Sequence, residues 1–286
     1  MGNEVMARDY VEFIQAQELS WTSDECFPEA QRKLLSIDNE TGARTQLQRY
    51  EPGYHCHTPH ALTCNEEFYV LQGCFFLNHF GYSPGCYGFF PAGYERSKFY
   101  VPEETVILRF FDHQPAPFAE DPEGAAARAK GREAIPCLDT YRMSWDTSMH
   151  ELHLTHLGFA RKNLRIDPVT GQRTFLFMTS PQSHPINFHG ARESHPTPEE
   201  AYQLHGDLTG HVGTMYPGAY FWRPPHIPHG PFGTRGGSLS LIRFVEGEHV
   251  NIWTDKQYGF NYNQAYEPIL PDWMERTSQY KPDANF

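Results

Sequence analysis

The chain has 286 residues, of which 39% are hydrophobic and 15% aromatic, a composition typical of a globular protein long enough for two domains. Its formal net charge of −12 argues against nucleic acid and against an anionic membrane surface as partners. No apolar run follows Met1, and no stretch approaches the roughly 18 apolar residues of a membrane span, so we expect neither a signal peptide nor a transmembrane segment. These features favour a cytoplasmic protein that acts on a small molecule.

Short β-rich runs, separated by glycine and proline turns, follow one another along the chain. A lead-in with an edge strand near Val11–Ile14 comes first, and strands are then expected at 44–50, 68–71, 74–77, 106–111, 174–178, 201–204, 219–222 and 238–244. Residues 122–134 carry the only convincing helical pattern, and residues 250–286 are expected to form an irregular arm. Many short strands with such turns favour an all-β sandwich or barrel.

The sequence contains an internal duplication. Residues 32–45 read RKLLSIDNETGART, and residues 161–174 read RKNLRIDPVTGQRT. A repeat of this length is domain-sized, far longer than the period of a solenoid. The expected division is an N-terminal domain over 1–112, a linker over 113–150, a C-terminal domain over 151–249 and the arm over 250–286.

Two spaced motifs recur in both copies. A glutamate is followed after six residues by a glycine, and a glycine after five residues by a proline, as Glu66–Gly73, Glu199–Gly206, Gly85–Pro91 and Gly218–Pro224. These spacings resemble the cupin family, whose members are small jelly-roll-like β-barrels with a metal in the mouth. The run Asp-x-x-Thr-Gly is similar to the cupin module of zinc-binding anti-sigma factors and acetylacetone-cleaving dioxygenases. The resemblance implies an all-β fold of two tandem cupin domains.

In the first copy, the family's metal positions fall on His60, Leu62, Glu66 and Arg96. Leucine cannot ligate a metal, and the permanently charged guanidinium of Arg96 repels a divalent cation. We therefore expect a degenerate site that serves structure, dimerisation or a substrate wall, with Arg96 paired to Glu66. Whether His60 and the off-pattern His55 and His57 rescue a site stays open.

In the second copy, the same positions fall on Glu193, His195, Glu199 and His229. Two imidazoles and a carboxylate with open positions form a facial triad suited to iron(II) and oxygen chemistry. The resemblance therefore implies one divalent ion per chain, foremost Fe(II), with Mn, Zn or Ni as alternatives.

Glu193 stands where the family usually has histidine, which leaves two roles open. It either ligates the metal as a fourth donor or stands off it as a catalytic base or orienting group. His226 replaces the glycine of the second motif, so it is a second catalytic candidate at the mouth of the barrel or a partner that fixes a ligand tautomer. His184, His189 and His205 are interpreted as hydrogen-bonding or surface histidines.

A substrate pocket is expected beside the ligands, because aromatic and apolar residues alternate on the neighbouring strands. Its predicted wall consists of Tyr202, Leu204, Tyr220, Trp222 and Phe232. Such a wall favours an aromatic or apolar ligand with one or two oxygens that chelate the metal.

Three functions remain for this chain. The first is a cupin-type dioxygenase that cleaves a C–C bond of a chelating diketone, hydroxyketone or catechol-like substrate. The others are a metal-dependent isomerase, lyase or hydrolase, and a ligand- or metal-sensing cupin without enzymatic activity. The six cysteines have no CxxC spacing and are expected to be reduced thiols, and a homodimer is expected.

Overall fold

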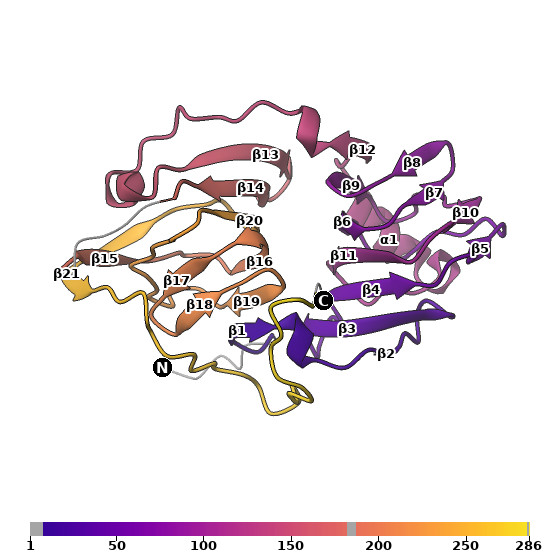
Figure 1. The fold of residues 1–286 in the computed structure, drawn as a ribbon. Helices are drawn as coiled ribbons and strands as arrows, with labels where there is room; N and C mark the ends of the chain where they lie inside the picture. The colour runs from indigo at the N-terminus through magenta and orange to yellow at the C-terminus, as the bar shows by residue number, and fades with distance from the viewer. Residues whose placement is uncertain (1–7, 182–186, 285) are drawn as a thin grey trace. The chain divides into compact units, whose positions relative to one another are not determined.

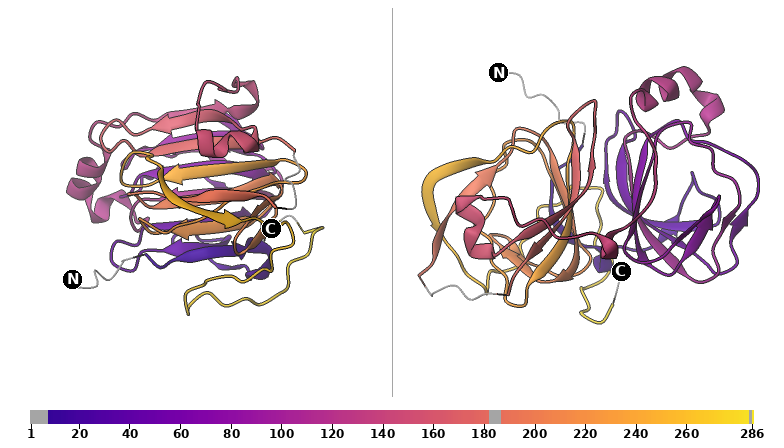
Figure 2. Two further views of the ribbon diagram at one scale, coloured as in Figure 1. Left: turned by 90° about the vertical axis from the view of Figure 1, so that its left-hand side faces the viewer. Right: turned by 90° about the horizontal axis from the view of Figure 1, so that it is seen from above.

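The structure is a computed structural model that describes residues 8–181, 187–284 and 286, and it divides into two compact units. The first unit comprises Trp21–Met143 with Arg8, and the second comprises Ser144–Phe286 with Asp9–Ser20. In each unit, strands curl into a β-barrel (Figures 1 and 2). The prediction of an all-β protein with two tandem barrels is confirmed.

The first unit holds a seven-stranded antiparallel sheet, ordered β12-β9-β6-β11-β4-β3-β2, and a four-stranded sheet, ordered β5-β10-β7-β8. The strands are β2 (Thr22–Ser23), β3 (Ala30–Ile37), β4 (Arg44–Tyr50), β5 (His55–Cys56), β6 (Glu66–Gln72), β7 (Phe75–Leu77), β8 (Phe80–Tyr82), β9 (Cys86–Phe90), β10 (Phe99–Tyr100), β11 (Thr105–Phe111) and β12 (Ile135–Asp139). Side chains alternate between the two faces of these strands, and those on the inner face form the core of the unit. The core contains Tyr50, Phe68, Val70, Phe75, Tyr82, Phe90 and Ile107.

The second unit holds a six-stranded sheet, ordered β1-β19-β16-β20-β14-β13, and the pairs β15-β21 and β17-β18. The strands are β1 (Val11–Gln15), β13 (Ala160–Ile166), β14 (Arg173–Thr179), β15 (His189–Ser194), β16 (Glu199–Gly206), β17 (Leu208–Gly210), β18 (Gly213–Met215), β19 (Ala219–Arg223), β20 (Ser238–Phe244) and β21 (Ile252–Gly259). One of its apolar clusters joins β1 to the barrel and contains Phe13, Ala201, Met215, Ala219 and Phe221.

The sequence repeat is a repeat of topology. The order β9-β6-β11-β4-β3 of the first unit matches β19-β16-β20-β14-β13 of the second. Gly73 and Gly206 occupy the same place in each copy, both with a φ of 72°. A Cβ on Gly206 would lie 1.9 Å from the Gly237 carbonyl oxygen, so only glycine fits this turn after β16.

Strands from outside the repeat complete both sheets, and they shift the expected boundaries. β12, which lies in the predicted linker, pairs with β9 of the first unit, and β1 pairs with β19 of the second. Residues 9–20 therefore lie in the second unit rather than in a 1–112 domain, and residues 113–143 lie in the first. The predicted arm is also regular in part, because β21 pairs with β15. Because these paired strands lie far apart in the sequence, no local sequence pattern predicts that they pair.

The predicted helix exists as α1 (Pro122–Ala129), shorter than expected. Asp121 caps it by accepting a hydrogen bond from the Gly124 amide at 3.0 Å, and Pro122 takes the first helical position. Short 3-10 turns occur at Ala16–Glu18, Phe118–Glu120, Thr140–Arg142 and Leu152–Leu157. Within the described ranges, no helix has the length and apolar character needed to cross a membrane. All six cysteines are free thiols.

Candidate metal centre

Backbone pairing brings the predicted ligands of the second unit together. Glu193 lies on β15, and it exchanges two backbone hydrogen bonds with His229, at 3.0 and 2.9 Å. His195 directly follows β15, and Glu199 begins β16. Strand pairing thus places side chains from distant parts of the sequence at one point of the barrel.

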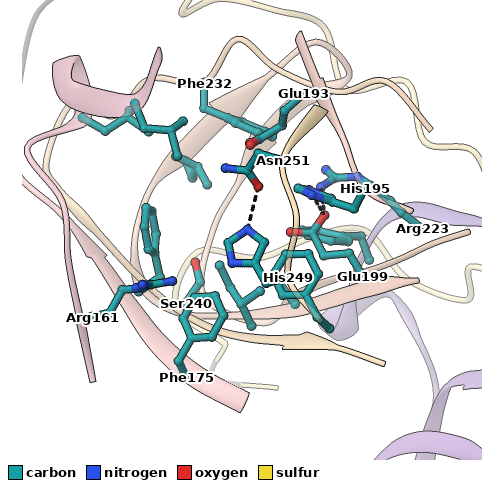
Figure 3. Close-up of a pocket in the computed structure, with 18 of the residues that line it drawn as sticks. Arg161, Phe175, Glu193, His195, Glu199, Arg223, Phe232, Ser240, His249 and Asn251 are labelled. Atoms are coloured by element: carbon teal, nitrogen blue, oxygen red, sulfur yellow. Dashed lines mark hydrogen bonds and ion pairs between the residues drawn. The ribbon is translucent and has the colours of Figure 1, made fainter. Parts of the chain in front are cut away.

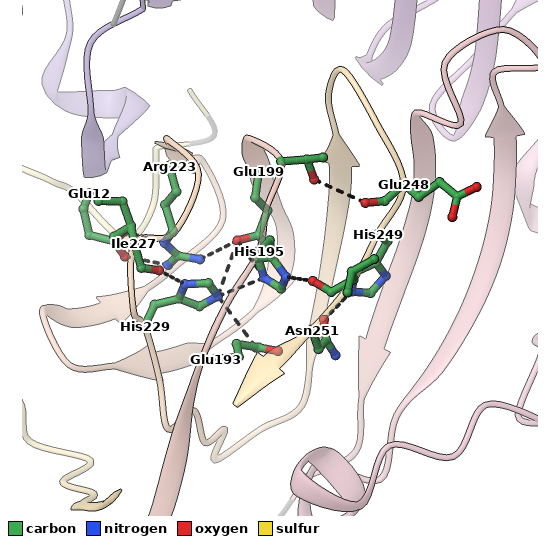
Figure 4. A network of polar contacts seen from close by, with 12 residues as sticks. Glu12, Glu193, His195, Glu199, Arg223, Ile227, His229, Glu248, His249 and Asn251 are labelled. Carbon is green, nitrogen blue, oxygen red and sulfur yellow. Dashed lines mark hydrogen bonds and ion pairs between the residues drawn. The ribbon is translucent and has the colours of Figure 1, made fainter. Parts of the chain in front are cut away.

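The side-chain donors converge closely (Figure 4). The Nε2 atoms of His195 and His229 lie 3.3 Å apart, and Glu193 Oε1 lies 3.8 Å from His229 Nε2. One ligand atom from each of these three residues falls within 4.8 Å of the other two. Adjacent donors that share one metal at about 2.1 Å lie roughly 3 Å apart, so this spacing suits a shared ion.

Both imidazoles are oriented by backbone carbonyls. His195 Nδ1 lies 3.0 Å from the Val250 oxygen, and His229 Nδ1 lies 2.9 Å from the Ile227 oxygen. A carbonyl can only accept, so each Nδ1 carries the proton and donates it. In the neutral rings each Nε2 is then a bare lone pair, and the two lone pairs face each other.

The protonation of the site follows from its burial. Burial, together with the charge of Arg223 and the neighbouring His195, lowers the pKa of His229 well below its ordinary value. Burial and the nearby Glu199 carboxylate raise the pKa of Glu193 to about 8, against the opposing influence of Arg223. His229 is therefore neutral near pH 7, whereas Glu193 holds its proton until a cation or a base displaces it.

Glu199 is shared between the histidines and a buried arginine. Its Oε2 lies 3.5 Å from His229 Nε2 and 3.8 Å from His195 Nε2. The same oxygen lies 2.9 Å from Arg223 Nη1. Arg223 is in turn held by both carboxylate oxygens of Glu12 on β1. The chain Glu12–Arg223–Glu199 was not predicted, and it fixes the position of the third ligand candidate.

A cavity opens beside these donors (Figure 3). Its empty volume, including the open mouth, is about 730 Å³. The wall is mostly apolar and includes Leu154, Leu157, Phe175, Phe177, Ala201, Leu208, Met215, Phe221, Phe232, Ile242 and Phe244. Glu193, His195 and Glu199 also line it. The candidate ligands therefore face a mostly apolar cavity, the setting typical of a small-molecule site.

Comparison with known protein families identifies the family of this chain. Residues 12–251 match the family described as a domain of unknown function (DUF4437). The chain belongs to the DUF4437 family. No curated protein matches the sequence.

Solved structures share the fold of this DUF4437 chain. One is a protein of Nostoc punctiforme described provisionally as a dioxygenase, with a TM-score of 0.70 and 18% identity over 90% of this chain and 93% of that one. Another is a cupin 2 conserved barrel protein of Leptotrichia buccalis, with a TM-score of 0.53 and 11% identity over 83% and 97%. A third is a mutant of Bacillus subtilis oxalate decarboxylase, with a TM-score of 0.52 and 12% identity over 84% and 78%. The predicted cupin fold is therefore confirmed; the narrower likeness to anti-sigma and acetylacetone-cleaving modules stays a prediction.

The predicted pocket wall of the DUF4437 chain needs correction. Phe232 lines the cavity, but Tyr202, Leu204, Tyr220 and Trp222 are buried elsewhere. Their neighbours Ala201, Gln203, Phe221 and Arg223 face the cavity instead. Successive side chains of a strand point to opposite faces, so an error of one residue in assigning the inward face exchanges all the inward-facing and outward-facing residues.

His226 is not in the site. Its side chain is exposed, and its backbone amide donates to the His195 carbonyl at 2.7 Å. With a φ of 64°, the residue lies in a turn that contacts His195 through the backbone, and it is not among the residues that line the cavity. His189 and His205 are exposed as expected, and His184 lies outside the described residues.

His249 is a site residue that the sequence did not reveal. It lines the cavity, stacks on Phe244 with ring centroids 4.0 Å apart, and its Nε2 lies 2.6 Å from Asn251 Oδ1. Burial and the neighbouring His195 lower the pKa of His249 to about 3, so the ring is neutral. It lies just past the end of β20, at the edge of the predicted arm, where no motif marked it.

The corresponding position of the first unit is closed by arginine. Arg96 Nη2 and Arg109 Nη2 each lie 2.6 Å from a carboxylate oxygen of Glu66, and all three side chains are buried. The expected pairing of Arg96 with Glu66 is present. His60 pairs with Arg96 through the backbone, whereas the side chains of His55 and His57 are exposed. Among the described residues of this unit, no group of three metal-binding side chains converges.

Proposed function

We propose that the second unit is a metal-dependent cupin oxygenase that cleaves a C–C bond of a small chelating diketone, hydroxyketone or catechol-like substrate with dioxygen. One divalent ion, foremost Fe(II), would be held by His195, His229 and the carboxylates of Glu193 and Glu199. The observation that carries the proposal is the approach of the two Nε2 lone pairs to 3.3 Å. Each ring donates its Nδ1 proton to a backbone carbonyl, which leaves both Nε2 atoms directed at one point, where they would bind a shared cation.

The donor set fits a hard or intermediate divalent ion. Two imidazoles with one or two carboxylates suit Fe(II) and Mn(II), and also accommodate Zn(II) or Ni(II). When bound, such an ion would supply a Lewis acid that polarises and orients a chelating substrate. Glu193 and Glu199 together with a divalent ion leave the site without net charge, which lowers the cost of burying it.

The remaining residues orient and shield the reacting groups. The Val250 and Ile227 carbonyls hold the imidazoles in the ligating tautomer. Arg223 fixes Glu199 and prevents it from turning away from the histidines. The apolar wall around Phe221 and Phe232 displaces water from a substrate whose oxygens face the ligands.

The raised pKa of Glu193 favours a second candidate function. A carboxyl group with a pKa of about 8 inside a cavity can take up a proton near neutral pH and return it. If Glu193 stands off the metal, the same site would serve a metal-dependent isomerase, lyase or hydrolase without dioxygen.

The experiment that tests the proposal is oxygen uptake by the Fe(II)-loaded protein with a panel of β-diketones, hydroxyketones and catechols. One equivalent of dioxygen consumed per substrate, with both oxygen atoms recovered in the two products, is the expected outcome. Turnover of a panel member without oxygen uptake would replace the oxygenase with the second candidate. Neither uptake nor turnover, in a protein that holds its ion, would contradict both.

We also propose that the chain forms a homodimer through edge strands, as related barrels do. Light scattering at micromolar concentration should give twice the chain mass, and a monomer would contradict this part of the proposal.

A further inference from the structure

A second polar group lines the cavity of the second unit away from the metal ligands. Arg161 lies on β13, and only 9% of the residue is exposed. Figure 3 shows it on the opposite side of the cavity from His195 and Glu199. Its guanidinium lies over the Phe175 ring, 5.2 Å from the centroid. A cation thus stands at one side of a mostly apolar space that has its carboxylates at the other.

Among the described residues, no carboxylate forms an ion pair or a side-chain hydrogen bond with the Arg161 guanidinium. Its Nε is buried and has no hydrogen-bond partner within the described part of the chain. Asp146 forms two backbone hydrogen bonds with Arg161, at 2.7 and 3.0 Å, and its carboxylate acts on the guanidinium only as a nearby charge, without an ion-pair contact among the described residues. The Asp146 carboxylate is turned to its own loop, where it accepts from the amide and hydroxyl of Ser148. The other buried arginines of the second unit are paired with carboxylates, as Arg223 is with Glu12.

Neighbouring groups add to the positive potential at Arg161. Burial and the charge of Arg173 lower the pKa of Arg161 and outweigh the opposing charge of Asp146, so a second guanidinium lies near the first. An unpaired buried guanidinium is costly, and a ligand anion would remove that cost.

We propose that Arg161 is the carboxylate-recognition residue of this cavity, so that the substrate is a small organic acid with an apolar or aromatic body. Its carboxylate pairs with the guanidinium while its chelating oxygens face the histidines. The fork of N–H donors matches a carboxylate in two parallel hydrogen bonds. This inference rests on the proposed function, since it assigns the substrate class of the same site.

The test compares acids with their neutral esters. The probes are 3,4-dihydroxybenzoate and 3-(3,4-dihydroxyphenyl)propanoate, which differ in length, and the methyl ester of each. Calorimetry under nitrogen on the metal-loaded protein should show at least one acid bound about 10–100-fold more tightly than its ester. Arg161→Met should abolish that preference and leave ester affinity and metal content unchanged. Arg161→Lys should restore part of it.

The control removes one positive charge elsewhere. Arg142→Gln changes an arginine of the first unit whose side chain is 88% exposed, and it should keep the full preference for the acid. Esters bound as tightly as acids, no acid bound at all, or an undiminished preference in Arg161→Met would each overturn the proposal. Absence of oxygen uptake alongside an Arg161-dependent acid preference would contradict only the oxygenase.

Discussion

Glu12 and Arg223 form a buried, two-pronged ion pair between residues 211 positions apart in the chain. Because Arg223 also contacts Glu199, a strand that precedes the first barrel in sequence supports the ligand site of the second. The pair therefore links the stability of the N-terminal strand β1 to the geometry of the candidate metal centre.

Replacing Glu12 with Gln should destabilise the second unit by about 3–5 kcal/mol, because it leaves the Arg223 charge buried with one carboxylate fewer. Trp222 and Trp253 lie in this unit, so denaturant unfolding followed by tryptophan fluorescence reports it. Glu275→Gln, at an exposed residue of the same unit, should change stability by less than about 0.5 kcal/mol. Equal stability of the two variants would show that the ion pair contributes nothing to the fold.

Metal affinity should depend on pH through Glu193. The pKa of its carboxyl group is raised to about 8 in the metal-free protein, so below that pH a metal must displace a proton. The affinity should rise by up to about tenfold per pH unit between roughly pH 6 and 8, and level off above. Glu193→Gln should remove this slope. A slope that persists in the variant would assign the proton to another group.

The two possible roles of Glu193, metal ligand and catalytic base, are distinguished by measuring metal content and turnover on the same variant. If the carboxylate ligates, Glu193→Ala should lower metal affinity about 10–100-fold or more. If it acts as a base, the variant should keep its ion and lose about 10²–10⁴-fold in rate. Glu193→His restores the family's usual residue and, under the ligand role, should bind Fe(II) at least as well as the parent. Unchanged content and rate in Glu193→Ala would reduce Glu193 to a rim residue.

The inward face of β16 can be checked with adjacent residues. Ala201→Leu adds the Cγ, Cδ1 and Cδ2 atoms at a residue that lines the cavity, so it should weaken 3,4-dihydroxybenzoate binding about tenfold or more while metal content stays the same. Tyr202→Phe should leave binding unchanged, because the Tyr202 ring lies outside the cavity and its hydroxyl has no partner among the described residues. The opposite result from the two variants would restore the original assignment of the strand faces.

The features that could be predicted from the sequence are those that the two copies of the repeat share or that differ at matching positions. The spacing of Glu199 and His229, matched at Glu66 and Arg96, predicted both the barrels and the asymmetry between their sites. It could not reveal Glu12, since a partner 211 positions away carries no local pattern. The faces of β16 and β19 were misread because aromatic residues lie on the buried outer side of these strands as well.

The central claim is that one divalent ion binds to each chain, at the second barrel. His229→Ala and Arg96→Ala remove side chains at matching positions of the two copies, and elemental analysis of the purified proteins compares them directly. The parent and Arg96→Ala should each contain about one ion per chain, and His229→Ala should lose at least about 90% of it under the same conditions. Two ions per chain in the parent, or full metal content in His229→Ala, would contradict the account.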